Sequence, residues 1–281
     1  MILNRQQAGL SLVELMIALV IGSFLILGAT QLYLSSQQNQ AFSSSSAANL
    51  EGARFATMVL DEQLSKAGFR RAPDQNITTA FPAATTMSDG CKGFAAGSAI
   101  APLKDGGSHG FCFRYQPATA DELSCGGENV GIDKIPFTPS SSSELVYVRI
   151  EFTPGVSPKD GQEHGKLVCK VSQGGAEHEG EIIEGVADFR VLMAEGEGLE
   201  RRLKSAALEL PAAIPDNAIV RALGYEILLA SGPNRRDGES KVFTEYLSGL
   251  EQARKTELQN KDKRHVYQVA TGGQAIRNLM P

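Results

Sequence analysis

The stretch LSLVELMIALVIGSFLILGATQLYL, residues 10–34, decides the fold of this chain. Its only charged residue is Glu14. As an α-helix it would measure roughly 37 Å at about 1.5 Å per residue, which exceeds the hydrocarbon thickness of a bilayer, about 30 Å. The stretch therefore predicts a membrane-spanning helix at the start of the chain.

Glu14 is the unusual residue of this helix. A carboxylate in a membrane-spanning segment is costly, which indicates a function. The preceding leader, MILNRQQAG, has Arg5 as its only charge and ends at Gly9. A plain signal anchor with Arg5 held inside would explain the apolar run but has no use for Glu14. An ordinary secretory signal fits poorly, because the apolar segment is too long and no small-residue cleavage site follows it.

The order Arg5, Gly9, Leu10 and Glu14 resembles the type III signal of type IV prepilins. The resemblance implies cleavage between Gly9 and Leu10, methylation of the new amine of Leu10, and a role for Glu14 in subunit assembly. Most members of the family have Phe where this chain has Leu10. The implied partner of Glu14 is the freed amine of a neighbouring subunit, since a carboxylate that loses water needs a positive charge beside it.

Charge is mild, with 27 Lys and Arg against 32 Asp and Glu. We expect no nucleic-acid partner, because no basic block is long enough to indicate one. Three short basic segments are interpreted as solvated surface: Arg201-Arg202, Arg235-Arg236 and residues 261–264. The length beyond the apolar run is sufficient for a substantial core.

The chain has four cysteines, all beyond the apolar run: Cys91, Cys112, Cys125 and Cys169. An even count outside the cytosol favours disulfides. A zinc site would require closely spaced pairs, and these cysteines are far apart. Their spacing alone leaves all three pairings open.

An amphipathic helix is predicted to follow the membrane span. Apolar residues recur at helical spacing between 50 and 67: Ala53, Ala56, Leu60, Leu64 and Ala67. Gly68 is placed to end the helix. The polar stretch 35–46 fits either a continuous helix or a loosened hinge. The apolar face of this helix requires a sheet to pack on.

Strands are predicted where β-branched or aromatic residues partly alternate, at 110–116, 144–152, 166–172, 181–192, 219–229 and 264–270. Segments 199–210 and 244–263 are interpreted as helical or mobile inserts. The expected fold is α+β, with one long N-terminal helix on an antiparallel sheet.

Several segments beyond the signal resemble the PilW-type minor pilins. They are GARF at 52–55 with the helix end LDEQLSKAGF at 60–69, LVCK at 167–170, IEGVADF at 183–189, the strand 220–231, HVY at 265–267 and Arg277-Asn278. Two features depart from the family: the first cysteine comes only at Cys91, and the charged insert 244–263 has no counterpart.

This resemblance implies a type IV pilin-like fold divided into a leader (1–9), a transmembrane half-helix (10–35) and a periplasmic or extracellular head (36–281). It implies a minor pilin of the tip complex that primes pilus assembly, with pilus-based adhesion and twitching motility. The implied partners are other minor pilins, the major pilin, a tip adhesin and prepilin peptidase. The protein would be a single-pass inner-membrane protein before assembly and would then reach the pilus. With the family in view, we expect the bridges Cys91–Cys112 and Cys125–Cys169.

Two other functions were weighed. A J-type pseudopilin of type II secretion shares the signal and the fold, but such proteins are typically shorter. A membrane-anchored periplasmic enzyme is remote: no histidine stands in an H-E-x-x-H arrangement, and no phosphate loop or dinucleotide fingerprint occurs. Asp105, Asp237 and Glu239 lie in Gly-rich loops, but solvated turns explain them better than calcium. No cofactor or metal is expected.

Overall fold

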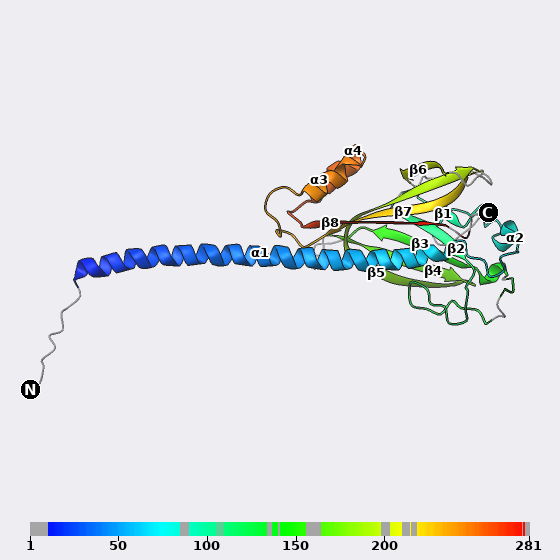
Figure 1. The fold of residues 1–281 in the computed structure, drawn as a ribbon, viewed down its shortest axis with the longest axis horizontal. Coiled ribbons are helices and arrows are strands. Elements are labelled where there is room, and N and C mark those ends of the chain that lie inside the picture. Colours follow the sequence, from blue (N-terminus) through cyan, green and yellow to red (C-terminus); the bar gives the residue numbers. More distant parts are fainter. Residues whose placement is uncertain are drawn as a thin grey trace, which may run out of the picture.

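The computed structural model describes residues 11–84, 90–105, 107, 109–133, 137–139, 141–155, 164–197, 203–209, 214, 218–276 and 278. A single helix, α1 (Leu12–Lys66), runs from the apolar segment into the head (Figure 1). The stretch 35–46 is helical, so the alternative of a hinge there is wrong. The helix ends as predicted, because Gly68 follows it with φ +70°, a conformation that favours glycine.

The head is built on one antiparallel sheet. Its strand order is β1-β2-β3-β4-β5-β7-β8, and β6 pairs with β5 outside this path. The strands are β1 (Ile100–Pro102), β2 (Gly110–Tyr115), β3 (Val146–Thr153), β4 (Gly165–Gln173), β5 (Ala176–Glu197), β6 (Leu203–Glu209), β7 (Ala218–Ala230) and β8 (Tyr267–Ala275). Gly174 and Gly175 join β4 to β5 with φ +58° and +90°, as a two-residue hairpin turn requires. The expected α+β architecture is confirmed.

The second half of α1 packs on the sheet through the predicted face. Its apolar residues are nearly inaccessible to solvent: Ala53, Ala56, Leu60, Leu64 and Ala67. A Cβ at Gly52 would lie 2.9 Å from Ile183 Cδ1, so glycine permits the close approach of α1 to β5. The hydroxyl of Tyr225 on β7 donates to Asp61 Oδ1 at 2.8 Å, which fixes the rotation of the helix against the sheet.

Short elements complete the head. They are α2 (Ile77–Ala80), the 3-10 turn η1 (Ser142–Glu144), α3 (Lys241–Ser248) and α4 (Gln252–Lys261). The insert 244–263 is thus helical, one of the two expected states. The interpretation of 199–210 as helical or mobile is wrong for its described part, because residues 203–209 form β6. β6 pairs with β5 in an antiparallel arrangement. This pairing outweighs the helix propensity of the Leu, Ala and Lys residues of β6.

Arg114 on β2 orders the loop-rich segment that follows α1. Its side chain is fully buried, and its guanidinium donates to the carbonyl oxygens of Ser98 (2.8 Å), Pro82 (2.7 Å) and Ala95 (3.1 Å). The charge also lies 4.7 Å from the ring centroid of Phe94. Backbone carbonyls that would otherwise be buried without donors are thereby paired, so a loop can serve as part of the core.

Candidate functional site

The first turn of α1 holds Glu14 in a reciprocal cap with Ser11. The Ser11 N–H donates to Glu14 Oε2 at 3.0 Å, and the Glu14 N–H donates to Ser11 Oγ at 3.2 Å. This is a capping box, in which each side chain satisfies one free backbone donor of the helix start. The sequence expectation for Glu14 missed this partner, although the S-x-x-E spacing of residues 11–14 is its signal.

The leader and the cleavage junction lie outside the described residues. This applies to Gly9 and Leu10, so cleavage and methylation there remain predictions. The carboxylate of Glu14 is exposed and stands one turn from the beginning of the described chain. It is therefore accessible to a group from another molecule.

The apolar half of α1 has no protein cover within the described chain. Leu12, Met16 and Phe24 keep 77%, 59% and 71% of their surface exposed. Figure 1 shows this half extending away from the head as a bare rod. It is the one described helix that is long and apolar enough to cross a membrane. An exposed apolar surface of this size requires a bilayer or other apolar helices around it.

The head is closed by two disulfides with the pairing that we expected. Cys91 is bonded to Cys112 on β2, with 6.0 Å between the Cα atoms. Cys125 is bonded to Cys169 on β4, with 6.2 Å between the Cα atoms. The first bridge attaches the segment after α2 to the sheet, and the second attaches a later loop.

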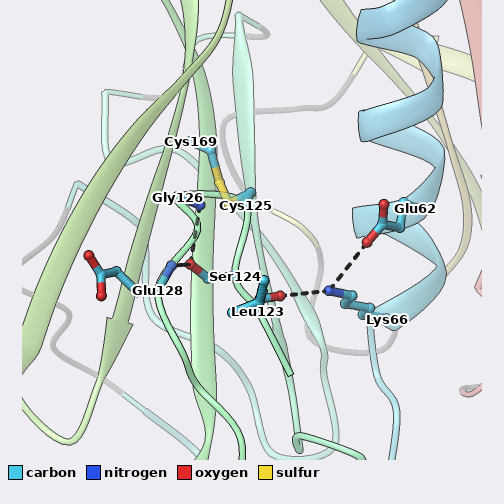
Figure 2. Close-up of a disulfide and its surroundings, with 8 residues drawn as sticks. All are labelled: Glu62, Lys66, Leu123, Ser124, Cys125, Gly126, Glu128 and Cys169. Carbon is cyan, nitrogen blue, oxygen red and sulfur yellow. Dashed lines mark hydrogen bonds and ion pairs between the residues drawn. A yellow bond between two sulfur atoms is a disulfide. The ribbon is translucent and has the colours of Figure 1, made fainter. Parts of the chain in front are cut away.

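The loop at the second disulfide also contacts α1. Figure 2 shows Lys66, in the last turn of α1, donating to the carbonyl oxygen of Leu123 at 3.1 Å. The Ser124 hydroxyl accepts from the N–H groups of Gly126 and Glu128 and shapes the turn around Cys125. The helix end, this loop and β4 therefore form one unit.

The insert of α3 and α4 is fastened to the sheet by a buried carboxylate. Asp188 on β5 is 4% exposed and accepts from the Tyr246 hydroxyl at 3.1 Å and from Arg254 Nε at 3.2 Å. Burial raises the pKa of Tyr246, and the Asp188 charge adds to this effect. Asp188 therefore joins the insert of α3 and α4 to the sheet. Sequence reasoning missed this contact, because no local spacing relates β5 to a helix so far along the chain.

The histidines do not assemble a metal site within the described residues. His265 is fully buried, with Nδ1 2.7 Å from the Ser231 carbonyl oxygen and 3.2 Å from His164 Nε2. His164 thus contacts this buried ring. Of the residues weighed for calcium, Asp105 accepts from the Gly107 N–H at 3.0 Å and lies 3.1 Å from His109 Nε2.

Comparison with known proteins bears on the N-terminal segment. Residues 4–30 match the family model described as the prokaryotic N-terminal methylation motif. The N-terminal segment therefore carries a prepilin-type processing motif. The motif implies processing by a prepilin peptidase.

No curated protein matches the sequence. Among solved structures, the chain is similar to a type IV-like pilin from Thermus thermophilus, with a TM-score of 0.43 and 16% sequence identity. The match covers 83% of this chain and 98% of that chain.

Proposed function

We propose that the chain is a PilW-type minor pilin that enters the priming or tip complex of a type IV pilus. Residues 1–9 are the leader, residues 10–35 span the inner membrane, and residues 36–281 form the exported head. Prepilin peptidase cleaves between Gly9 and Leu10, and the new amine of Leu10 is methylated. The observation that supports this proposal most directly is the bare apolar half of α1, which carries one accessible carboxylate in its first turn.

The physical basis of assembly is the exchange of lipid for neighbouring helices around α1. Apolar side chains are equally satisfied by lipid or by other apolar helices, so they supply attraction without choosing a position along the helix. Glu14 determines the axial position of α1 against its neighbours, because a carboxylate buried among helices requires a cation within a few ångströms. The freed amine of a neighbouring pilin provides this cation only after the leader has been removed.

The partners in this proposal are other minor pilins, the major pilin and a tip adhesin. The protein waits in the inner membrane with its head in the periplasm and then moves to the cell surface within the pilus, where it contributes to adhesion and twitching motility. The two disulfides agree with a head that folds outside the cytosol.

Processing is the first test of the proposal. Co-expression with a prepilin peptidase should remove residues 1–9, which intact-mass spectrometry of the membrane-extracted protein detects directly. Gly9→Val should block the cleavage, because a branched side chain crowds the junction. Recovery of the unshortened chain from membranes that contain an active peptidase would refute the proposal.

A J-type pseudopilin of type II secretion is the second candidate, since the motif at residues 4–30 fits both systems. A chromosomal deletion separates them when surface pili and exoprotein release are scored in the same strain. Loss of pili with normal secretion supports the minor pilin. The opposite result assigns the chain to the secretion system.

A further inference from the structure

A basic groove lies between α1 and the head, just beyond the apolar half of the helix. It has a volume of about 810 Å³ and is lined on one side by residues 37–42 and 44 of α1, which are polar except for Ala41 and Phe42. The opposite side is formed by Asn234, Arg235, Arg236, Asp237 and Arg264. In Figure 1 the orange loop between β7 and α3 is the part of the head nearest the bare half of α1.

The charge of the groove is positive although the chain is net negative, at −5. Three arginines face one aspartate among the lining residues. The Arg236 guanidinium is already paired with Asp262. Arg235 and Arg264 are exposed, and within the described part of the chain neither forms an ion pair with a carboxylate. Two guanidinium groups are thus available to an anion from outside the molecule.

Both arginines are held on a preformed platform. The N–H groups of Arg235 and Arg236 donate to the Arg264 carbonyl oxygen at 3.1 and 3.2 Å, which joins the two loops. Arg264 has φ +60°, which a non-glycine residue adopts only at a cost. The Asn49 side chain donates to the Val266 carbonyl oxygen at 2.8 Å and fixes the platform on α1.

The position of the groove relative to the membrane follows from its place along α1. Tyr33 lies at the end of the apolar run and its hydroxyl accepts from Gln37 Nε2 at 2.7 Å, which suits a side chain at the level of the lipid headgroups. With Leu34 at the hydrocarbon edge, residues 37–44 stand roughly 5–15 Å above that edge at about 1.5 Å per residue. The groove therefore lies in or directly above the headgroup layer, within about one Debye length of the lipid phosphates.

We propose that this groove binds the phosphate of an anionic phospholipid of the periplasmic leaflet while the subunit waits in the inner membrane. Arg235 and Arg264 contact the phosphate oxygens, for which the planar guanidinium is well suited. The Gln, Asn and Ser side chains of residues 37–40 and 44 offer hydrogen bonds to the glycerol part of the headgroup. The bound lipid sets the height of the head above the membrane. This inference rests on the transmembrane placement of residues 10–35 in the proposed function.

The test is a native mass-spectrometry titration of the full detergent-solubilised chain with phosphatidylglycerol or phosphatidylcholine. The wild type should bind phosphatidylglycerol more tightly, and Arg235→Gln/Arg264→Gln should weaken this binding by roughly 25-fold, at about fivefold per arginine. Binding of phosphatidylcholine should not change. Arg54→Gln/Lys104→Gln is the matched control, because it removes the same charge from two exposed residues that do not line the groove.

Equal binding of the two lipids by the wild type, or an equal loss in the control variant, would overturn the proposal. If the groove variant binds phosphatidylglycerol normally but is depleted from pili, the groove contacts a neighbouring protein and the lipid proposal is wrong. The titration needs only the anchored chain. Failure of leader cleavage would therefore refute the proposed function and leave the lipid result intact.

Discussion

The capping box allows the charge of Glu14 to be separated from its hydrogen bonds. Glu14→Gln keeps an acceptor for the Ser11 N–H, since Gln serves at this position of a capping box, but removes the charge. Ser11→Ala keeps the charge and removes the acceptor of the Glu14 N–H. Glu14→Ala removes both. Glu14→Asp keeps the charge and shortens its reach by one methylene.

The two roles of Glu14, as a helix cap and as a partner for a positive charge, differ in the free energy that each contributes. Loss of one half of an exposed cap costs about 1 kcal/mol, and only at the end of a helix with many further turns. Leaving the amine of a neighbouring subunit buried without its carboxylate costs about 3–5 kcal/mol, which is at least about a hundredfold in incorporation. We therefore expect Glu14→Gln and Glu14→Ala to be nearly absent from pili, Glu14→Asp to be intermediate and Ser11→Ala to incorporate almost normally.

The assay is the amount of this protein in sheared pili relative to membranes, measured by quantitative immunoblot. Mass spectrometry of the membrane pool confirms that each variant is present and has lost residues 1–9. Normal incorporation of Glu14→Gln would refute the charge-pairing argument. If, in addition, Ser11→Ala were the variant that failed to enter pili, Glu14 would act only as a helix cap.

Three predictions concern the head. Replacing Cys125 and Cys169 together by Ser should lower the free energy of unfolding, measured by denaturant titration, by about 4 kcal/mol in the chain-entropy description of a 44-residue loop. Non-reducing peptide mapping that finds other cysteine pairs would contradict the bridges. Asp188→Ala should cost about 2–3 kcal/mol because it leaves the buried Tyr246 hydroxyl without an acceptor, whereas Glu257→Gln on the same insert should cost less than about 1 kcal/mol. The free energy of unfolding should also fall above about pH 10, by at most about 1.4 kcal/mol per pH unit for each of four buried tyrosines. Burial raises the pKa of these tyrosines in the folded head, so the unfolded chain loses their protons first as the pH rises. Unfolding free energies that stay constant between about pH 9 and 12 would contradict this prediction. The tyrosines are Tyr115, Tyr225, Tyr246 and Tyr267.

Features that depend on local pattern could be predicted from the sequence. The end of α1 was predicted because its apolar spacing stops where Gly68 follows. Strands β2, β3, β4, β5 and β7, and the first part of β8, were predicted because β-branched or aromatic residues partly alternate in them. The disulfide pairs followed from the resemblance to a family, since spacing alone left three pairings.

Features that depend on distant pairing could not be predicted. The segment of β6, LKSAALE at 203–209, consists largely of good helix formers, and only the presence of β5 beside it makes it a strand. Arg235 and Arg264 were interpreted as separate solvated residues, because only the pairing of β7 with β8 brings their loops together. The capping box of Ser11 and Glu14 was different, because the S-x-x-E spacing that indicates it was present in the sequence. That spacing was missed because Glu14 was interpreted only as an assembly residue.

The position of the first disulfide limits how far the head can be stretched by tension along α1. The helix is held to the sheet by non-covalent packing, and both bridges lie beyond its end. If α1 were peeled away, only residues 68–90 could straighten before the load reached Cys91, which is bonded to Cys112 on β2. At about 3.5 Å per residue this slack is roughly 80 Å, after which the pull is borne by a covalent link to the sheet. The bridge therefore acts as a tether that keeps a detached helix within reach of its docking face.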